Sequence, residues 1–171
     1  MILIAIGANL PLGAGTSPLA TCEAAVREIR AIPGLNLQKQ STWYRSQAIP
    51  VSDQPDYCNG VISVTGDIEP WALLHALQVI EAGFGRVRSV PNAARTLDLD
   101  IIDMAGMVCR EPTLTLPHPR AHERAFVLCP LLDVAPLWEH PVLRQSASRL
   151  LASLPPQAIT PWHDMSAPSR V

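Results

Sequence analysis

Apolar residues recur along the first part of the chain with two periods, one typical of strands and one of helices. The continuous apolar run at residues 2–7 predicts a buried strand that ends at a glycine. Residues 35–46 favour an extended segment, and residues 57–65 alternate between two faces. Residues 95–102 alternate in the same way. The pattern therefore predicts strands at these positions.

Two segments between the strands have the helical period instead. The first begins after the N-cap candidate Ser17 and ends at Pro33-Gly34, and the second begins at Pro70 and ends near Gly83 and Gly85. Their apolar stripes are formed by Leu19, Cys22, Val26 and Ile29 in the first and by Leu73, Leu77, Ile80 and Phe84 in the second.

The order strand, helix, strand, strand, helix, strand predicts an α+β fold of the ferredoxin-like βαββαβ type. Such a fold is an antiparallel sheet with two helices packed on one face. After residue 105 the pattern weakens, and we expect a short helix at residues 125–134 and a terminal amphipathic helix as a C-terminal helical extension. We expect a single domain over residues 1–154 and a loose, proline-rich tail over residues 155–171.

Two aspartates in the last predicted strand are the strongest chemical signal. Asp98 and Asp100 share one face, about 6.6 Å apart along the strand, whereas Leu97 and Leu99 point to the other. If the helices cover the leucine face, the aspartate face stays open. Two like charges at this spacing suit a pair of Mg²⁺ ions bridged by phosphates, since Mg²⁺ takes few protein carboxylates. A solvated polar face is the alternative reading.

Composition limits the other function classes. The chain has 171 residues, 48% of them hydrophobic, and a formal net charge of −2, so an anion site must be local and nucleic acid is not an expected partner. Lys39 is the only lysine, and Arg86, Arg88 and Arg95 lie close to the aspartates in sequence. Arginine matches phosphate oxygens well, so this cluster favours a polyphosphate substrate. The chain has no P-loop motif.

Cysteine spacing and the N-terminal residues predict the compartment. Cys22, Cys58, Cys109 and Cys129 form no CxxC pair, which favours free thiols in a reducing environment. The apolar start of the chain has no basic n-region and is too short to span a bilayer. We therefore expect a cytoplasmic protein without a membrane partner.

Taken together, the motifs closely resemble the 6-hydroxymethyl-7,8-dihydropterin pyrophosphokinase family of folate synthesis. The resemblance covers about residues 2–135 in unchanged order. It is carried by Ile4-Ala5-Ile6-Gly7-Ala8-Asn9-Leu10, Tyr44-Arg45-Ser46, Asp53-Gln54-Pro55-Asp56-Tyr57-Cys58-Asn59, Glu81 through Arg88, Arg95-Thr96-Leu97-Asp98-Leu99-Asp100-Ile101, Leu116-Pro117-His118 and Arg124-Ala125-Phe126.

The resemblance implies that the terminal pyrophosphoryl group of ATP is transferred to the hydroxymethyl group of a reduced pterin, giving AMP. It assigns two Mg²⁺ ions to Asp98 and Asp100 and places Arg86 and Arg95 as catalytic arginines over the phosphates. The implied ATP contacts are Gln78, Glu81, Arg88, Ile101, Thr115, His118 and Arg124. The implied pterin contacts are Ser46, Ile49, Tyr57, Asn59 and Phe126.

Two other readings stay open at this point. One is a different metal-dependent phosphotransferase or nucleotide hydrolase on the same sheet, and the other is a non-catalytic module that binds RNA or a protein partner. The chain has no aromatic-rich RNA-binding motif and no basic excess, which weighs against the second. We expect ATP and the pterin as partners and a monomeric state. Asn92-Ala93-Ala94 departs from the aromatic-containing loop common in the family, and Asp103 has no assigned role.

Overall fold

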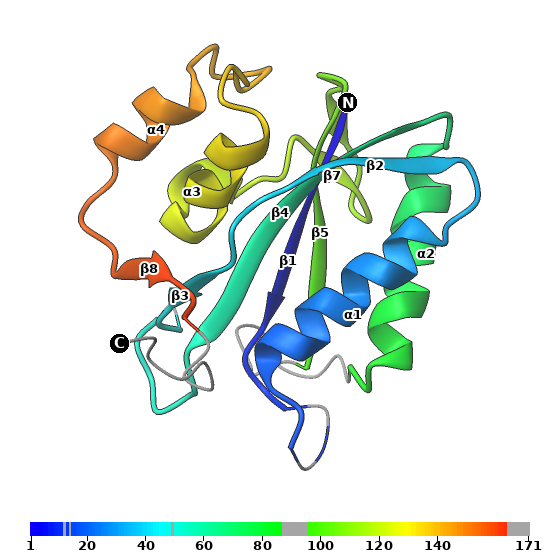
Figure 1. Cartoon of the computed structure of the whole chain (residues 1–171). Helices are drawn as coiled ribbons and strands as arrows, with labels where there is room; N and C mark the ends of the chain where they lie inside the picture. The colour runs from blue at the N-terminus through cyan, green and yellow to red at the C-terminus, as the bar shows by residue number, and fades with distance from the viewer. Residues whose placement is uncertain (12, 14, 49, 87–95, 164–171) are drawn as a thin grey trace.

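A six-stranded antiparallel sheet organises the computed structural model of the chain, which describes residues 1–11, 13, 15–48, 50–86 and 96–163 (Figure 1). Its strands are β1 (Ile2–Ala8), β2 (Leu35–Gln40), β3 (Tyr44–Ser46), β4 (Tyr57–Gly66), β5 (Asp98–Met104) and β8 (Ile159–Pro161). The strand order is β5-β1-β4-β3-β8, and β2 also pairs with β4. β1 and β4 therefore lie at the centre, and their apolar sequences fit that position.

One face of the sheet is covered by α1 (Pro18–Arg30) and α2 (Pro70–Gly83), as the stripe pattern predicts. Ile4 and Ile6 of β1 and Leu99 of β5 form one apolar cluster with the buried stripes of both helices. The Ser17 hydroxyl accepts a hydrogen bond from the Ala20 N–H at 3.1 Å, so the predicted N-cap is confirmed.

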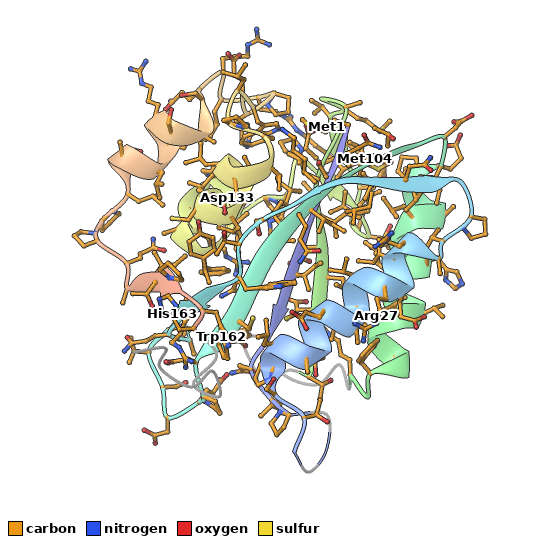
Figure 2. All side chains as sticks on the ribbon, viewed as in Figure 1. Met1, Arg27, Met104, Asp133, Trp162 and His163 are labelled. Atoms are coloured by element: carbon orange, nitrogen blue, oxygen red, sulfur yellow. The ribbon has the colours of Figure 1, made fainter. Side chains whose placement is uncertain are left out.

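The expectation that the second face stays open is wrong for the part of that face under α3 and α4. α3 (Ala125–Val134) and α4 (Ala147–Ser153) pack there, on the opposite side from α1 and α2 (Figure 1). Leu3, Val61 and Ile102 of the sheet form a second apolar cluster with these helices. The Asp133 carboxylate of α3, labelled in Figure 2, accepts hydrogen bonds from Thr42 N–H and the Tyr44 hydroxyl, at 3.1 and 3.0 Å.

The extended segment at residues 35–46 is two strands rather than one. β2 and β3 both pair with β4, and the chain leaves the sheet between them at residues 41–43. Trp43 lies over Gly60, where an added Cβ would come within 2.6 Å of the indole ring. The glycine thus makes room for the indole against the sheet.

The remaining elements follow β5. A hairpin of β6 (Cys109–Arg110) and β7 (Thr115–Leu116) leads to a 3-10 turn, η1 (Ala121–Glu123), which precedes α3. Residues 159–161 form β8, so this part of the predicted loose tail is an edge strand instead. Among the described residues, no helix combines the length and apolar character needed to cross a membrane.

Asp103, which the sequence leaves without a role, joins β5 to the C-terminal helices. Its buried carboxylate accepts hydrogen bonds from the Gly106 N–H at 3.2 Å and from the Trp138 indole N–H at 3.0 Å. The neighbouring His140 is also buried, and its Nδ1 accepts hydrogen bonds from the Val142 and Leu143 N–H groups. Burial and nearby His122 lower the pKa of His140, although Asp103 acts in the opposite direction.

We predict that His140 makes the fold less stable in acid. A histidine titrates near pH 6.5 in the unfolded chain and at lower pH in this fold, so between these values only the unfolded chain binds the proton. The free energy of unfolding should therefore fall as the pH drops below about 6.5. In His140→Asn, which keeps an acceptor near the position of Nδ1, denaturant titrations should show a smaller fall. His75→Asn, at an exposed position of α2, is the matched control and should follow the wild type.

Candidate functional site

A cavity of about 440 Å³ opens on the second face of the sheet, beside α3. Its floor includes Ala5 and Gly7 of β1, which are small enough to leave space above the strand. The predicted site residues that line it are Ser46, Tyr57, Asn59, Asp98, Asp100, Arg124 and Phe126. Residues that the sequence assigned to a metal, to ATP and to a pterin thus meet in one cavity.

Strand register explains how these side chains come together. Gly7 of β1 pairs with Asp98 of β5 on one side and with Asn59 of β4 on the other. Residues paired across neighbouring strands share a face, so Asp98 and Asn59 flank the glycine, two strand spacings or roughly 10 Å apart. Ala5 pairs with Asp100 in the same way. The carboxylates therefore lie at one end of the cavity and the amide at the other.

The carboxylate end is held by a partly buried arginine, Arg86. The Arg86 Nη1 donates to the Glu81 carboxylate at 2.5 Å, to the Leu97 carbonyl oxygen at 3.2 Å and to the Asp98 carboxylate. Burial opposes the charge of Arg86, but Asp98, Glu81 and Asp100 outweigh it and raise the pKa of the guanidinium. Arg86 is therefore a permanent cation beside the two aspartates.

Glu81 is the partner that fixes this arginine. Its side chain is only 3% exposed, and its Oε2 also accepts a hydrogen bond from the Leu99 N–H at 3.2 Å. The carboxylate thus ties the end of α2 to β5. Glu81 lies beneath Arg86 and is absent from the cavity lining.

His118, a predicted ATP contact, lies next to Asp100 but is not part of the cavity lining. Its Nε2 is 3.7 Å from the Asp100 Oδ2, and its Nδ1 accepts a hydrogen bond from the Arg120 N–H at 3.1 Å. Burial, together with Arg124, lowers its pKa to about 4, although Asp98 acts in the opposite direction. The imidazole is therefore neutral near pH 7, with the proton on Nε2, facing Asp100.

The other end of the cavity suits a flat ligand with polar edges. The Asn59 Nδ2 donates to the Ser46 Oγ at 2.7 Å, and the amide is 5% exposed. A Cβ at Gly7 would come within 3.0 Å of the Asn59 Oδ1, so the glycine gives this amide its space. Tyr57 and Phe126 add aromatic surface, and the Arg124 guanidinium lies 5.5 Å from the centre of the Phe126 ring.

Several predicted contacts lie elsewhere. Gln78 is exposed on α2, Thr115 is exposed on β7, and Ile101 is buried in the apolar cluster beneath the other face of the sheet. None of the three lines the cavity. Ile49, Arg88 and Arg95 lie outside the described residues.

Several contributors escaped the sequence analysis, among them Asn9 and Gln157. Asn9, buried at the end of β1, donates from Nδ2 to the Gln54 Oε1 at 3.2 Å and to the Pro55 carbonyl oxygen at 3.1 Å. It thereby fixes the segment that leads into Tyr57, and its place in the first motif was a usable signal. Gln157 lines the cavity from the C-terminal segment. The proline-rich sequence around it contains no pattern that indicates this role.

The donor set fits a metal whose coordination is completed by a ligand. In the part of the chain that the structure describes, no three His, Cys, Asp or Glu side chains are grouped to hold an ion by themselves. Asp98 and Asp100, with side chains 20% and 37% exposed, present carboxylate oxygens at a cavity wall. Mg²⁺ needs only one or two such carboxylates when phosphate oxygens and water supply the rest.

Comparison with solved structures supports the same fold. A triple mutant of Plasmodium falciparum HPPK-DHPS with STZ-DHP matches with a TM-score of 0.66 at 12% identity. The match covers 88% of this chain and 42% of that one, so this chain spans about two fifths of the solved protein's length. At this identity the likeness concerns the fold alone.

Comparison with known sequences identifies the family. The family model for 7,8-dihydro-6-hydroxymethylpterin-pyrophosphokinase (HPPK) matches residues 3–136. A 2-amino-4-hydroxy-6-hydroxymethyldihydropteridine pyrophosphokinase from Synechocystis sp. is 36% identical over 156 residues, covering 91% of this chain and 80% of the relative. The protein of the same name from Pseudomonas aeruginosa is 38% identical over 135 residues, covering 79% and 80%. The chain therefore belongs to the 7,8-dihydro-6-hydroxymethylpterin-pyrophosphokinase family, as its motifs predict.

Proposed function

We propose that this pyrophosphokinase of folate biosynthesis carries out its reaction in the cavity beside α3, with Mg²⁺ and ATP. The reaction of the family is transfer of pyrophosphate from ATP to 6-hydroxymethyl-7,8-dihydropterin, which releases AMP. The observation that supports the site is the row Asp98, Gly7 and Asn59 across three adjacent strands. This row places a carboxylate that can bind phosphates through a metal ion and a buried amide that can bind the heterocycle in the same cavity.

In this proposal the pterin lies at the Asn59 end. Asn59 and Ser46 offer hydrogen-bonding groups to the ring edge, and Tyr57 and Phe126 offer aromatic surface to its faces. A flat, hydrogen-bonding heterocycle needs both features. The exocyclic hydroxymethyl group then points along the floor of Gly7 and Ala5 towards the carboxylates.

The triphosphate lies at the other end. Asp98 and Asp100 would hold two Mg²⁺ ions, which would neutralise charge on the triphosphate and stabilise the charge that develops on its oxygens during transfer. Arg86 stays charged beside them, and Arg124, whose guanidinium lines the cavity, can bind phosphate oxygens. His118, neutral near pH 7, can donate a hydrogen bond without adding charge. Group transfer of this kind depends mainly on positioning and charge neutralisation, so no protein nucleophile is required.

Further features of the proposal come from the sequence and from the strand order. The order β5-β1-β4 followed by β2 and β3 is the one expected of a ferredoxin-like βαββαβ core, with α3 and α4 as a C-terminal extension. Arg95 remains a proposed catalytic arginine, Arg88 a proposed ATP contact and Ile49 a proposed pterin contact. Gln78, Glu81, Ile101 and Thr115 remain predicted ATP contacts. The monomeric state, the cytoplasmic location and the domain bounds also stay predictions.

The direct test is AMP formation from ATP and Mg²⁺ with and without 6-hydroxymethyl-7,8-dihydropterin. We expect AMP only when the pterin is present and a new pterin diphosphate in equal amount. AMP or ADP formed at the same rate without the pterin would indicate a nucleotide hydrolase instead. No turnover by folded protein would contradict the proposed reaction.

Removing either candidate metal ligand should stop the transfer without unfolding the chain. Asp98→Asn and Asp100→Asn keep the shape of the side chain but remove its charge, so we expect pterin-dependent AMP formation to fall by about 100-fold or more. Asp67→Asn, at an exposed position between β4 and α2, is the matched control and should retain full activity. Near-normal activity of both aspartate variants would refute the metal assignment.

The contributions of Arg86 and Glu81 to the free energy of unfolding should be coupled. Arg86→Ala leaves the buried Glu81 carboxylate without its guanidinium, which should lower the free energy of unfolding by about 3–5 kcal/mol. In Glu81→Gln/Arg86→Ala the buried carboxylate charge is removed together with its guanidinium partner, so the loss should be smaller than the sum of the two single losses. Additive losses in urea titrations would show that the pair is not coupled.

A further inference from the structure

The C-terminal segment holds the edge of the sheet next to the cavity. β8 pairs antiparallel with β3, with Ile159 opposite Ser46, and the Trp162 N–H donates to the Trp43 carbonyl oxygen at 2.8 Å. The Arg45 guanidinium lies 4.0 Å from the centre of a Trp162 ring, a close cation–π contact. Figure 2 shows Trp162 at this edge of the molecule. All of this segment lies beyond residues 3–136, which the family model matches.

Gln157, just before β8, reaches from this segment to the start of α3. Its Oε1 accepts a hydrogen bond from the Ala125 N–H at 2.9 Å, and its Nε2 donates to the Glu123 carbonyl oxygen at 3.1 Å. The residue at the N-cap position, Arg124, makes no side-chain cap of its own. The first N–H groups of a helix need partners from outside the helix. Gln157 therefore caps α3 from 32 residues away.

The two backbone groups that Gln157 binds flank the residues that face the ligand. Arg124 lies between Glu123 and Ala125, and Phe126 follows Ala125 directly. Both side chains line the cavity, and their cation–π contact spans this turn. A shift of the turn would move the Phe126 ring and the backbone of Arg124.

A second cavity borders this turn on its other side. It has a volume of about 390 Å³ and is lined largely by apolar side chains, among them Val51, Pro156 and Ile159. Phe126 and Gln157 line both cavities, so they lie where the two meet. Space on the second side leaves the Phe126 ring less confined by packing than a core ring would be. The hydrogen bonds of Gln157 supply the restraint instead.

We infer that Gln157 is a positioning residue for the pterin, acting through the backbone of Glu123 and Ala125 to hold Phe126 against the ring. This inference rests on the proposed function of the cavity. It gives a part of the chain outside the matched family region a role in substrate binding. In the proposed site Phe126 faces the pterin, whereas Arg124 reaches the phosphates through a long side chain whose rotamers can adjust to a small shift of its backbone. The larger effect should therefore fall on the pterin rather than on ATP.

The test compares Gln157→Met, Gln157→Glu and the wild type in steady-state assays of AMP formation. Methionine keeps the length of the side chain and loses both hydrogen bonds, so KM for the pterin should rise by about five- to tenfold, the equivalent of a lost cap. KM for ATP should change by less than about twofold, a shift too small to equal one lost hydrogen bond. Glutamate keeps the acceptor for Ala125 N–H, so its KM for the pterin should lie between those of the wild type and Gln157→Met.

Gln38→Met, at an exposed position of β2 remote from the cavity, is the matched control and should leave both KM values unchanged. If Gln157→Met does not fold, the Kd of the pterin for folded Gln157→Glu carries the test and should exceed that of the control. An unchanged pterin KM in Gln157→Met, or equal rises for pterin and ATP together with a lower Tm, would overturn the inference, because the cap would then be merely structural. A wild type without pterin-dependent AMP formation would instead refute the proposed function.

Discussion

The candidate site depends on the ion pairs that Arg86 forms with Glu81 and Asp98. The arginine brings a positive charge between a buried glutamate of α2 and an aspartate of β5, two groups that would otherwise repel each other. Through the Glu81 contact with the Leu99 N–H, the same ion pair sets the position of β5 against α2. The strand that carries Asp98 and Asp100 is thereby held in register by the charge that also balances them. A structural ion pair and the phosphate chemistry proposed for the site share one guanidinium.

The two faces of the sheet have different roles, one in packing and the other in the proposed ligand binding. α1 and α2 cover one face with apolar side chains and give the central strands a rigid base. α3 and α4 cover only part of the other face, and the cavity lies in the part they leave, over Ala5 and Gly7. The small residues on the central strand make the cavity deep enough for a ligand. Charged and polar residues on the strands to either side offer it contacts. The rigid face thus supports the one on which binding takes place.

The sequence was sufficient for the elements whose signals are local. The helical stripes, the N-cap Ser17 and the alternating strands need only near neighbours to be recognised, and the family was recognisable from its motifs. The covering of the second face was not predictable in the same way, because residues 125–134 are apolar nearly all round and show no preferred direction. β8 is a three-residue edge strand containing Pro161, and only its pairing with β3 defines it. The buried pair of Glu81 and Arg86 and the cap from Gln157 join residues through tertiary contacts, which no local pattern encodes.

The most direct test of the proposed site is a crystal structure of the chain with Mg²⁺, 6-hydroxymethyl-7,8-dihydropterin and an ATP analogue whose α,β-bridge cannot be cleaved. We expect metal ions bound by carboxylate oxygens of both Asp98 and Asp100, with the pterin ring beside Asn59 and Phe126. Arg86 should remain next to Glu81 while the metals take over the charge balance of Asp98. Metal ions bound to other residues, or a pterin bound outside the cavity beside α3, would contradict the proposed site.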